Sequence, residues 1–98
     1  IGDLILSSAL YGIRGNSSMN MEDFDDAIYN FKKADKISSN KNNNPQYMIS
    51  LAISLIANKE FGNAALILDK VVLSDNLSYS DKNKAEELLA LANFSTNN

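Results

Sequence analysis

The sequence predicts an all-α protein of about five helices arranged as antiparallel hairpins. Apolar residues recur at spacings of three and four along most of the 98 residues, which is the period of an amphipathic helix. Apolar and polar residues do not alternate with a period of two over more than a few positions, so the sequence predicts no strand. Residues 11–37 also match residues 48–74 without gaps at a constant offset of 37, and such self-similarity is typical of repeat proteins.

The first segment, residues 3–19, carries conflicting signals. Its apolar residues indicate a helix, whereas Gly12 and Gly15 are weak helix formers. Read alone, the segment predicts a break at Gly12. The comparison with the second unit of the repeat predicts instead a helix over about residues 8–21.

The next helix is predicted over residues 22–38, with Asn20 as its N-cap. One apolar stripe runs along it, formed by Phe24, Ala27, Ile28, Phe31, Ala34 and Ile37. Acidic residues gather in its first turns, namely Glu22, Asp23, Asp25 and Asp26. They lack the glycine and the distal glutamate of a calcium loop. Complementarity to the helix dipole therefore explains them better than a cation site.

A further helix is predicted to begin at Pro45, with Asn44 as its N-cap, and to stop near Asn58 and Lys59. One of its faces is formed by Met48, Leu51, Ala52 and Leu55. A second apolar face is formed by Ile49, Ile53 and Ile56. A helix that is apolar on two faces has neighbours on both sides or lines a groove.

Two more helices complete the prediction, and residues 38–44 are predicted to form a loop. One helix runs from about Glu60 to residues 74–76, with a stripe formed by Phe61, Ala64, Ala65, Leu68 and Val71. The last begins at Ser80 or Asp81 and runs to about residue 94, with a stripe formed by Ala85, Leu88, Leu89 and Ala92. Residues 95–98 are expected to fray.

The matched positions of the two units share their chemical character. Tyr11 pairs with Met48, Gly15 with Ala52, Phe24 with Phe61, Ala27 with Ala64, Phe31 with Leu68 and Ala34 with Val71. This pattern of large, small and aromatic positions resembles the tetratricopeptide repeat. The resemblance implies a right-handed superhelix with one repeat over about 8–41, a second over about 45–78 and a capping helix over about 80–94.

Three residues depart from the family pattern, and the period is longer. Arg14 stands at a usually apolar position, Ser18 replaces an aromatic residue and Asn76 stands where the repeat usually ends in proline. The family period is about 34 residues. The three extra residues fit in the loop over residues 39–44, where additional length costs little.

The composition excludes several functions. The chain contains neither cysteine nor histidine, so it offers no disulfide, no thiolate nucleophile, no imidazole base and no zinc site built from those residues. A net charge of −3 with a single arginine, Arg14, disfavours nucleic-acid binding. Neither a phosphate-binding loop nor a nucleophile elbow is visible. We therefore expect no enzyme activity, no cofactor and no metal.

The expected location is the cytoplasm, because the absence of cysteine fits a reducing compartment. Apolar runs stay well below the roughly 18 residues that a membrane span needs. The chain begins at Ile1 rather than methionine, so a processed leader or a longer parent chain stays open.

The resemblance implies a binding function: capture of a partner peptide or helix in a concave groove lined by the first helix of each repeat. The groove positions include Asn16, Met19, Gln46, Ile49, Ile53 and Ile56, together with Ala9, Gly12, Asn20 and Ala57. The three isoleucines are not expected to pack the hairpin. They predict an apolar wall that suits an amphipathic or extended apolar segment.

Alternatives stay open for this wall. Residues 1–7 or a second copy of the chain could cover the isoleucines, and the latter would make a homo-oligomeric structural module. A dedicated chaperone for an assembly subunit, as in bacterial secretion systems, is a further possibility by analogy. Some family members clamp a carboxylate with lysine and asparagine. Asn16 matches one asparagine, but Gly12 and Ser50 stand at the lysine positions, so no such clamp is expected.

Overall fold

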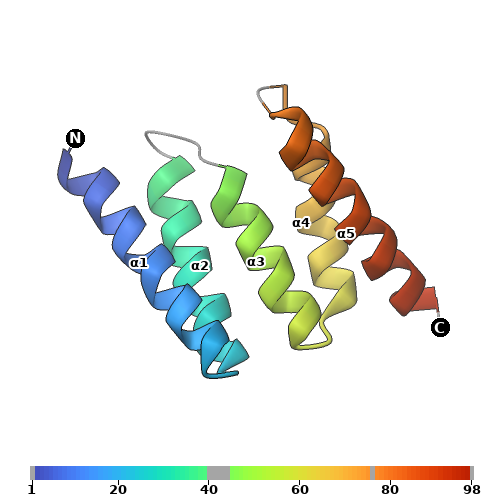
Figure 1. Ribbon diagram of the computed structural model, residues 1–98, viewed down its shortest axis with the longest axis horizontal. Helices are drawn as coiled ribbons and strands as arrows, with labels where there is room; N and C mark the ends of the chain where they lie inside the picture. The colour runs from blue at the N-terminus through green and yellow to red at the C-terminus, as the bar shows by residue number, and fades with distance from the viewer. Residues whose placement is uncertain (1, 40–44, 76, 98) are drawn as a thin grey trace.

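A computed structural model describes residues 2–39, 45–75 and 77–97 of the chain. These residues form five helices and no strand, which confirms the predicted all-α class (Figure 1). The helices are α1 (Gly2–Asn20), α2 (Phe24–Ser39), α3 (Pro45–Ala57), α4 (Phe61–Val72) and α5 (Tyr79–Asn97).

The helices form two layers, with α1, α3 and α5 in front of α2 and α4 in the view of Figure 1. Each helix packs on the next one along the chain, and α5 also contacts α3. The molecule measures 43 × 33 × 18 Å, and its short dimension corresponds to two helices, which pack about 8–10 Å apart. In the described part of the chain α1 and α3 are connected mainly through α2, which packs on both.

The turn between α1 and α2 stops the first helix with a specific backbone pattern. Glu22 has a positive φ of 59°. Its N–H donates to the carbonyl of Met19 at 3.0 Å, and the N–H of Asp23 donates to the carbonyl of Ser18 at 2.9 Å. These two bonds define a Schellman motif, which satisfies carbonyls at the helix end.

The turn between α3 and α4 repeats this pattern 37 residues later. Lys59 has a φ of 62°. Its N–H donates to the carbonyl of Ile56 at 2.9 Å, and the N–H of Glu60 donates to the carbonyl of Leu55 at 2.8 Å. The offset found in the sequence is therefore also an offset in backbone geometry, and the predicted stop near Lys59 is confirmed.

Replacing Lys59 by glycine should stabilise the protein. The left-handed conformation costs a residue with a side chain about 1–2 kcal/mol, whereas glycine adopts it freely. We expect the free energy of unfolding of Lys59→Gly to exceed that of Lys59→Ala by about 1 kcal/mol in urea denaturation. The alanine variant is the matched control, because it removes the charge and keeps the strain. Equal stability of the two variants would contradict the assigned turn.

The start of α2 differs from the prediction. The N–H of Asp26 donates to Oδ1 of Asp23 at 3.3 Å, so Asp23 is the N-cap and the helix begins at Phe24. The predicted cap, Asn20, is instead the last residue of α1. The prediction was wrong because Glu22 lies in the left-handed turn, which no α-helix can include.

Two other helices also have different ends. Helix α4 stops at Val72 rather than at residues 74–76, and the N–H of Ser74 turns back to the carbonyl of Val71 at 3.0 Å. Helix α5 begins at Tyr79, behind Ser78, whose Oγ accepts from the N–H of Asp81 at 3.1 Å.

The C-terminal end of α5 and the loop before α3 complete this comparison. Residues 95–97 are helical rather than frayed, and the hydroxyl of Thr96 donates to the carbonyl of Ala92 at 2.9 Å. Ser38 and Ser39 belong to α2 rather than to a loop. The rest of the predicted loop, residues 40–44, and with it the predicted cap Asn44, lie outside the described residues.

The helix over about residues 8–21 that the repeat comparison predicts is confirmed in running through Gly12, although α1 already begins at Gly2. The break that the segment predicts when read alone is wrong. A Cβ atom built on Gly15 would lie 2.6 Å from Cε1 of Phe31 in α2. One built on Gly12 would lie 2.7 Å from Cε1 of Tyr47 in α3. Each glycine thus admits an aromatic ring to the helix backbone, and this packing outweighs the weak helix propensity of glycine.

Two clusters of buried side chains form the core. One joins α2, α3, α4 and α5 through Ala27, Ile28, Phe31, Leu51, Leu55, Ala64 and Ala92. The other joins α3, α4 and α5 through Ile49, Ala52, Leu68, Val71 and Ala85. The small residues in both clusters let neighbouring helices approach closely.

Candidate binding groove

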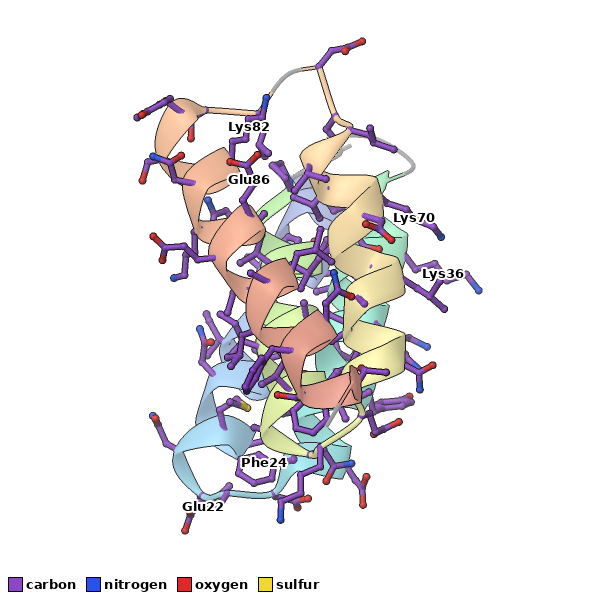
Figure 2. All side chains as sticks on the ribbon, turned by 90° about the vertical axis from the view of Figure 1, so that its right-hand side faces the viewer. Glu22, Phe24, Lys36, Lys70, Lys82 and Glu86 are labelled. Atoms are coloured by element: carbon purple, nitrogen blue, oxygen red, sulfur yellow. The ribbon has the colours of Figure 1, made fainter. Side chains whose placement is uncertain are left out.

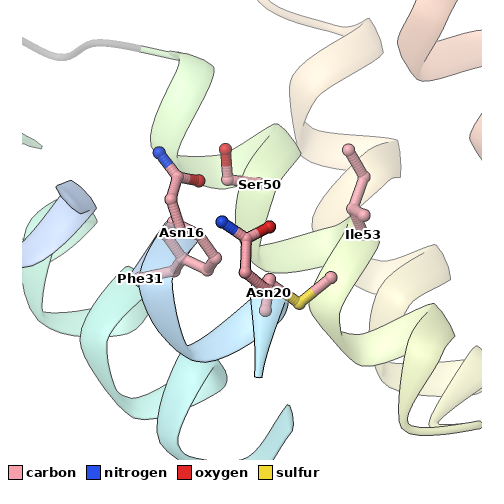
Figure 3. Close-up of a pocket in the computed structure, with 6 residues that line it drawn as sticks. Asn16, Asn20, Phe31, Ser50 and Ile53 are labelled. Atoms are coloured by element: carbon pink, nitrogen blue, oxygen red, sulfur yellow. The ribbon is translucent and has the colours of Figure 1, made fainter. Parts of the chain in front are cut away.

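A groove runs between α1 and α3 and consists of two adjoining pockets of about 380 Å³ each. The first, the Ile53 pocket, is lined by Asn16, Met19, Asn20, Phe31, Ser50 and Ile53 (Figure 3). The second, the Tyr47 pocket, is lined by Ala9, Gly12, Ile13, Asn16, Phe31, Gln46, Tyr47 and Ser50. Because Asn16, Phe31 and Ser50 line both, the two pockets form one continuous α1–α3 groove.

The floor of the groove comes from the back layer. Phe31 of α2 is only 2% exposed and belongs to the core, yet its ring reaches both pockets between the two front helices. It reaches them because Gly15 of α1 leaves room for the ring. The close contact that holds the first hairpin together therefore also shapes the groove.

The walls carry uncharged polar groups at helical spacing. Asn16 and Asn20 lie one turn apart on α1, and Gln46 and Ser50 lie one turn apart on α3. Figure 3 shows Asn16 and Asn20 on the α1 side and Ser50 and Ile53 on the α3 side. Amides both donate and accept hydrogen bonds, as do hydroxyls. None of the described residues that line the two pockets is charged.

Seven of the ten predicted groove residues line the pockets, namely Ala9, Gly12, Asn16, Met19, Asn20, Gln46 and Ile53, whereas Ala57 lines neither. Ile49 does not, because it is 2% exposed and packs in the core with Leu68, Val71 and Ala85. The expectation that Ile49 stands apart from the hairpin packing is therefore wrong. Its side chain is covered by α4 and α5 of the same chain.

The other two isoleucines of that face have different surroundings. Ile56 is half-buried and packs against both core clusters, and it is not among the residues that line the pockets. Ile53 packs against the second cluster and also lines the Ile53 pocket. The predicted apolar wall of three isoleucines is thus reduced to Ile53 alone.

Sequence reasoning missed several groove residues. Ile13, Phe31, Tyr47 and Ser50 line the pockets but were not predicted to bind a partner. A glycine at position 12 was a signal for Tyr47, because a missing side chain in one helix admits a large one from its neighbour. Phe31 was assigned to the core, and a helical period alone does not indicate that its ring also reaches a surface pocket.

Gln46 is held by the last helix. Its Nε2 donates to Oδ1 of Asp81 at 2.7 Å, which connects the start of α3 to the start of α5. Helix α3 also contacts α5, whereas the groove lies between α3 and α1.

Two of the acidic residues near the turn between α1 and α2, Asp25 and Asp26, have hydrogen-bond partners within the protein. Oδ2 of Asp26 accepts from the hydroxyl of Ser18 at 2.6 Å and from Nδ2 of Asn30 at 3.2 Å. Oδ1 of Asp25 accepts from Nδ2 of Asn58 at 3.2 Å, across the two turns. Ser18 is buried, and its hydroxyl is satisfied by Asp26 and by the carbonyl of Arg14. In the described part of the chain no group of acidic residues is arranged to hold a metal ion.

One carboxyl group with a shifted pKa lies outside the groove. Burial raises the pKa of the Asp35 carboxyl in α2 above its ordinary value, and the positive charge of Lys70 in α4 partly opposes this rise. Figure 2 shows Lys70 and Lys36 on the same side of the molecule, that of α2 and α4. Perturbed groups often mark functional sites, but Asp35 does not line either pocket.

Comparison with models of known protein families, with curated proteins and with solved structures finds no match. The candidate site therefore rests on the residues of this chain. Of the five helices described, none is both long enough and apolar enough to cross a membrane.

Proposed function

We propose that this chain is a protein-interaction module that binds a peptide segment of a partner in the α1–α3 groove. The observation that carries the proposal is the pair of adjoining pockets between the first helices of two consecutive hairpins. The resemblance to the tetratricopeptide repeat implies binding at the same place.

The chemistry of the groove supports a binding role. Each pocket lies within the roughly 300–1,000 Å³ range of ligand sites, which combine an apolar lining with a few placed polar groups. Phe31, Met19 and Ile53 supply the apolar surface, and Asn16 and Ser50 stand where the two pockets join. A ligand that occupies both pockets must therefore pass between Asn16 and Ser50.

Selection from a library of random peptides tests the proposal. We expect peptides enriched on the wild-type chain to bind Asn16→Lys at least about tenfold more weakly, a loss of about 1.4 kcal/mol, because the long charged side chain enters the groove. Ser17→Lys is the matched control. It adds the same charge to the adjacent exposed position, which lines neither pocket, and it should bind as the wild type does.

Two outcomes would contradict the proposal. One is that the selected peptides bind both lysine variants equally well, which would place their site elsewhere. The other is a dimer in light scattering that Asn16→Lys dissociates and Ser17→Lys does not. In that case a second copy of the chain occupies the groove, and the homo-oligomeric module replaces the peptide-binding module. A dedicated chaperone would use the groove for an assembly subunit instead.

A further inference from the structure

The outer face of α2 carries an ordered row of exposed side chains. This face points away from the front layer, on the side of the molecule where Figure 2 shows Lys36. Six exposed residues recur on it at spacings of three and four, namely Asp25, Asp26, Tyr29, Lys32, Lys33 and Lys36. Residues at these spacings are neighbours on a helix surface. The six side chains therefore form one continuous strip, opposite the buried side of the helix.

The charges of this strip are arranged antisymmetrically about Tyr29. Asp26 and Asp25 precede Tyr29 by three and four residues. Lys32 and Lys33 follow it by the same three and four residues. The helix dipole favours acidic residues at the start of a helix and basic residues at its end, but it requires neither equal spacings nor an aromatic residue between them. The strip is thus complementary to its own copy turned end to end.

Tyr29 stands at the centre of the strip and is 58% exposed. No other large apolar or aromatic side chain among the described ones of α2 is exposed. Aromatic residues are enriched at the centres of protein interfaces, and two aromatic rings attract each other in offset or edge-to-face geometry. A two-fold axis that crosses α2 at Tyr29 would bring the rings of two copies together.

The aspartates of the strip are already held in place at the start of α2. Oδ1 of Asp25 accepts from Nδ2 of Asn58, and Oδ2 of Asp26 accepts from the hydroxyl of Ser18. An ionised carboxylate accepts at both of its oxygens, so these bonds are compatible with a further contact to a lysine. Because the side chains are ordered beforehand, they lose little conformational freedom on association.

We propose that the outer face of α2 pairs with the same face of a second copy of this chain, antiparallel about a two-fold axis at Tyr29. The acidic half of each strip then lies against the basic half of the other. A contact of this kind is isologous and closes at the dimer. A contact made by one helix of each copy is smaller than the roughly 1,200 Å² of a stable complex, so the association is weak and reversible.

The proposed contact is independent of the proposed binding function. None of the six strip residues lines the pockets of the α1–α3 groove. A dimer formed through α2 therefore presents two grooves at once. Linked binding sites of this kind increase the avidity for a partner that carries two bound segments.

Sedimentation equilibrium of the whole chain at low ionic strength tests the proposal, because surface charges are least screened there. We expect a monomer–dimer equilibrium at concentrations up to about 1 mM, the range in which small contacts are populated. Asp25→Lys and Lys32→Glu should each weaken dimerisation about tenfold or more, because like charges then meet at two symmetric places. Glu87→Lys and Lys84→Glu are the matched controls. They make the same changes of charge at exposed positions of α5 and should dimerise as the wild type does.

An equimolar mixture of Asp25→Lys and Lys32→Glu is the decisive measurement. In the mixed dimer one copy carries only lysines at this pair of positions and the other only acidic residues, so each contact again joins opposite charges. We expect the mixture to dimerise about as strongly as the wild type. Tyr29→Lys gives an independent test that leaves both aspartates in place. It brings two lysines together on the axis and should abolish the dimer, while circular dichroism shows an unchanged helix content.

Several outcomes would overturn the inference. One is a wild-type chain that stays monomeric over the whole concentration range, and another is assembly beyond the dimer. A mixture that associates no better than either variant alone would exclude the antiparallel pairing. A dimer that Asn16→Lys dissociates and Tyr29→Lys does not would place the contact in the α1–α3 groove. That last result would count against the proposed function as well, whereas the others leave it standing.

Discussion

Replacing Gly15 by alanine should lower the free energy of unfolding by about 1–3 kcal/mol, the usual cost of overpacking a core. The sign is the reverse of what helix propensity predicts, since alanine in a helix is about 1 kcal/mol more favourable than glycine. The new Cβ atom would lie 2.6–2.7 Å from three ring atoms of Phe31. Phe31 is buried between α1, α2 and α3, so its ring cannot move without disturbing the core.

Gly62→Ala provides the matched control for this substitution. Gly62 also lies in a helix, α4, but a Cβ atom built there has no neighbour within 4 Å. We expect that variant to gain up to about 1 kcal/mol from helix propensity. Chemical denaturation of both variants gives the comparison, and Phe31→Leu in the Gly15→Ala background should recover part of the loss. Stabilisation by both alanines would show that α1 and α2 are not in the close contact described.

Replacing Leu68 by alanine should be the more damaging change, with a loss of about 2–5 kcal/mol. Leu68 is fully buried in the second core cluster, where it packs with Ile49 of α3, Val71 of α4 and Ala85 of α5. Removing its side chain leaves a cavity at the point where three helices meet. The loss is large compared with the 5–15 kcal/mol that keeps a typical domain folded.

Leu66→Ala is the control for Leu68→Ala. Leu66 lies on the same helix, about half a turn before Leu68, and its side chain is 64% exposed. Surface substitutions of this kind stay within about 0.5 kcal/mol. Both variants should be measured by urea denaturation, with the m-value compared with that of the wild type to verify that a single transition is retained. Equal losses at the two positions would mean that α4 faces the core differently.

The local features of the fold could be predicted from the sequence to a good approximation. The stripe that includes Ala27, Phe31 and Ala34 predicted which face of α2 is buried, and all three residues are buried. Pro45 predicted the start of α3. These features depend on neighbours within one helix turn, which the order of residues alone specifies. The predicted ends of the helices were less accurate. A residue in the left-handed conformation that is not glycine, such as Glu22, has no strong signal in the sequence.

The groove depended on contacts between helices that are distant in sequence. Ile49 and Ile53 are four residues apart on one predicted apolar face, yet α4 and α5 cover the first and leave part of the second in the groove. A helical period assigns residues to faces, but the position of each neighbouring helix decides which part of a face stays accessible. Phe31 reached the groove only because Gly15 of another helix left space for its ring.

The sequence by itself determined the all-α class, the 37-residue offset between hairpins and the residue types available for chemistry, because these follow from composition and local period. The tertiary structure alone decided that the rings of Tyr47 and Phe31 pack at Gly12 and Gly15, that Ile49 is core, and that the groove lies between α1 and α3 with Phe31 as its floor. The physical reason is that helix propensity and apolar periodicity act within one element. Close packing instead depends on the shapes of side chains from several elements together.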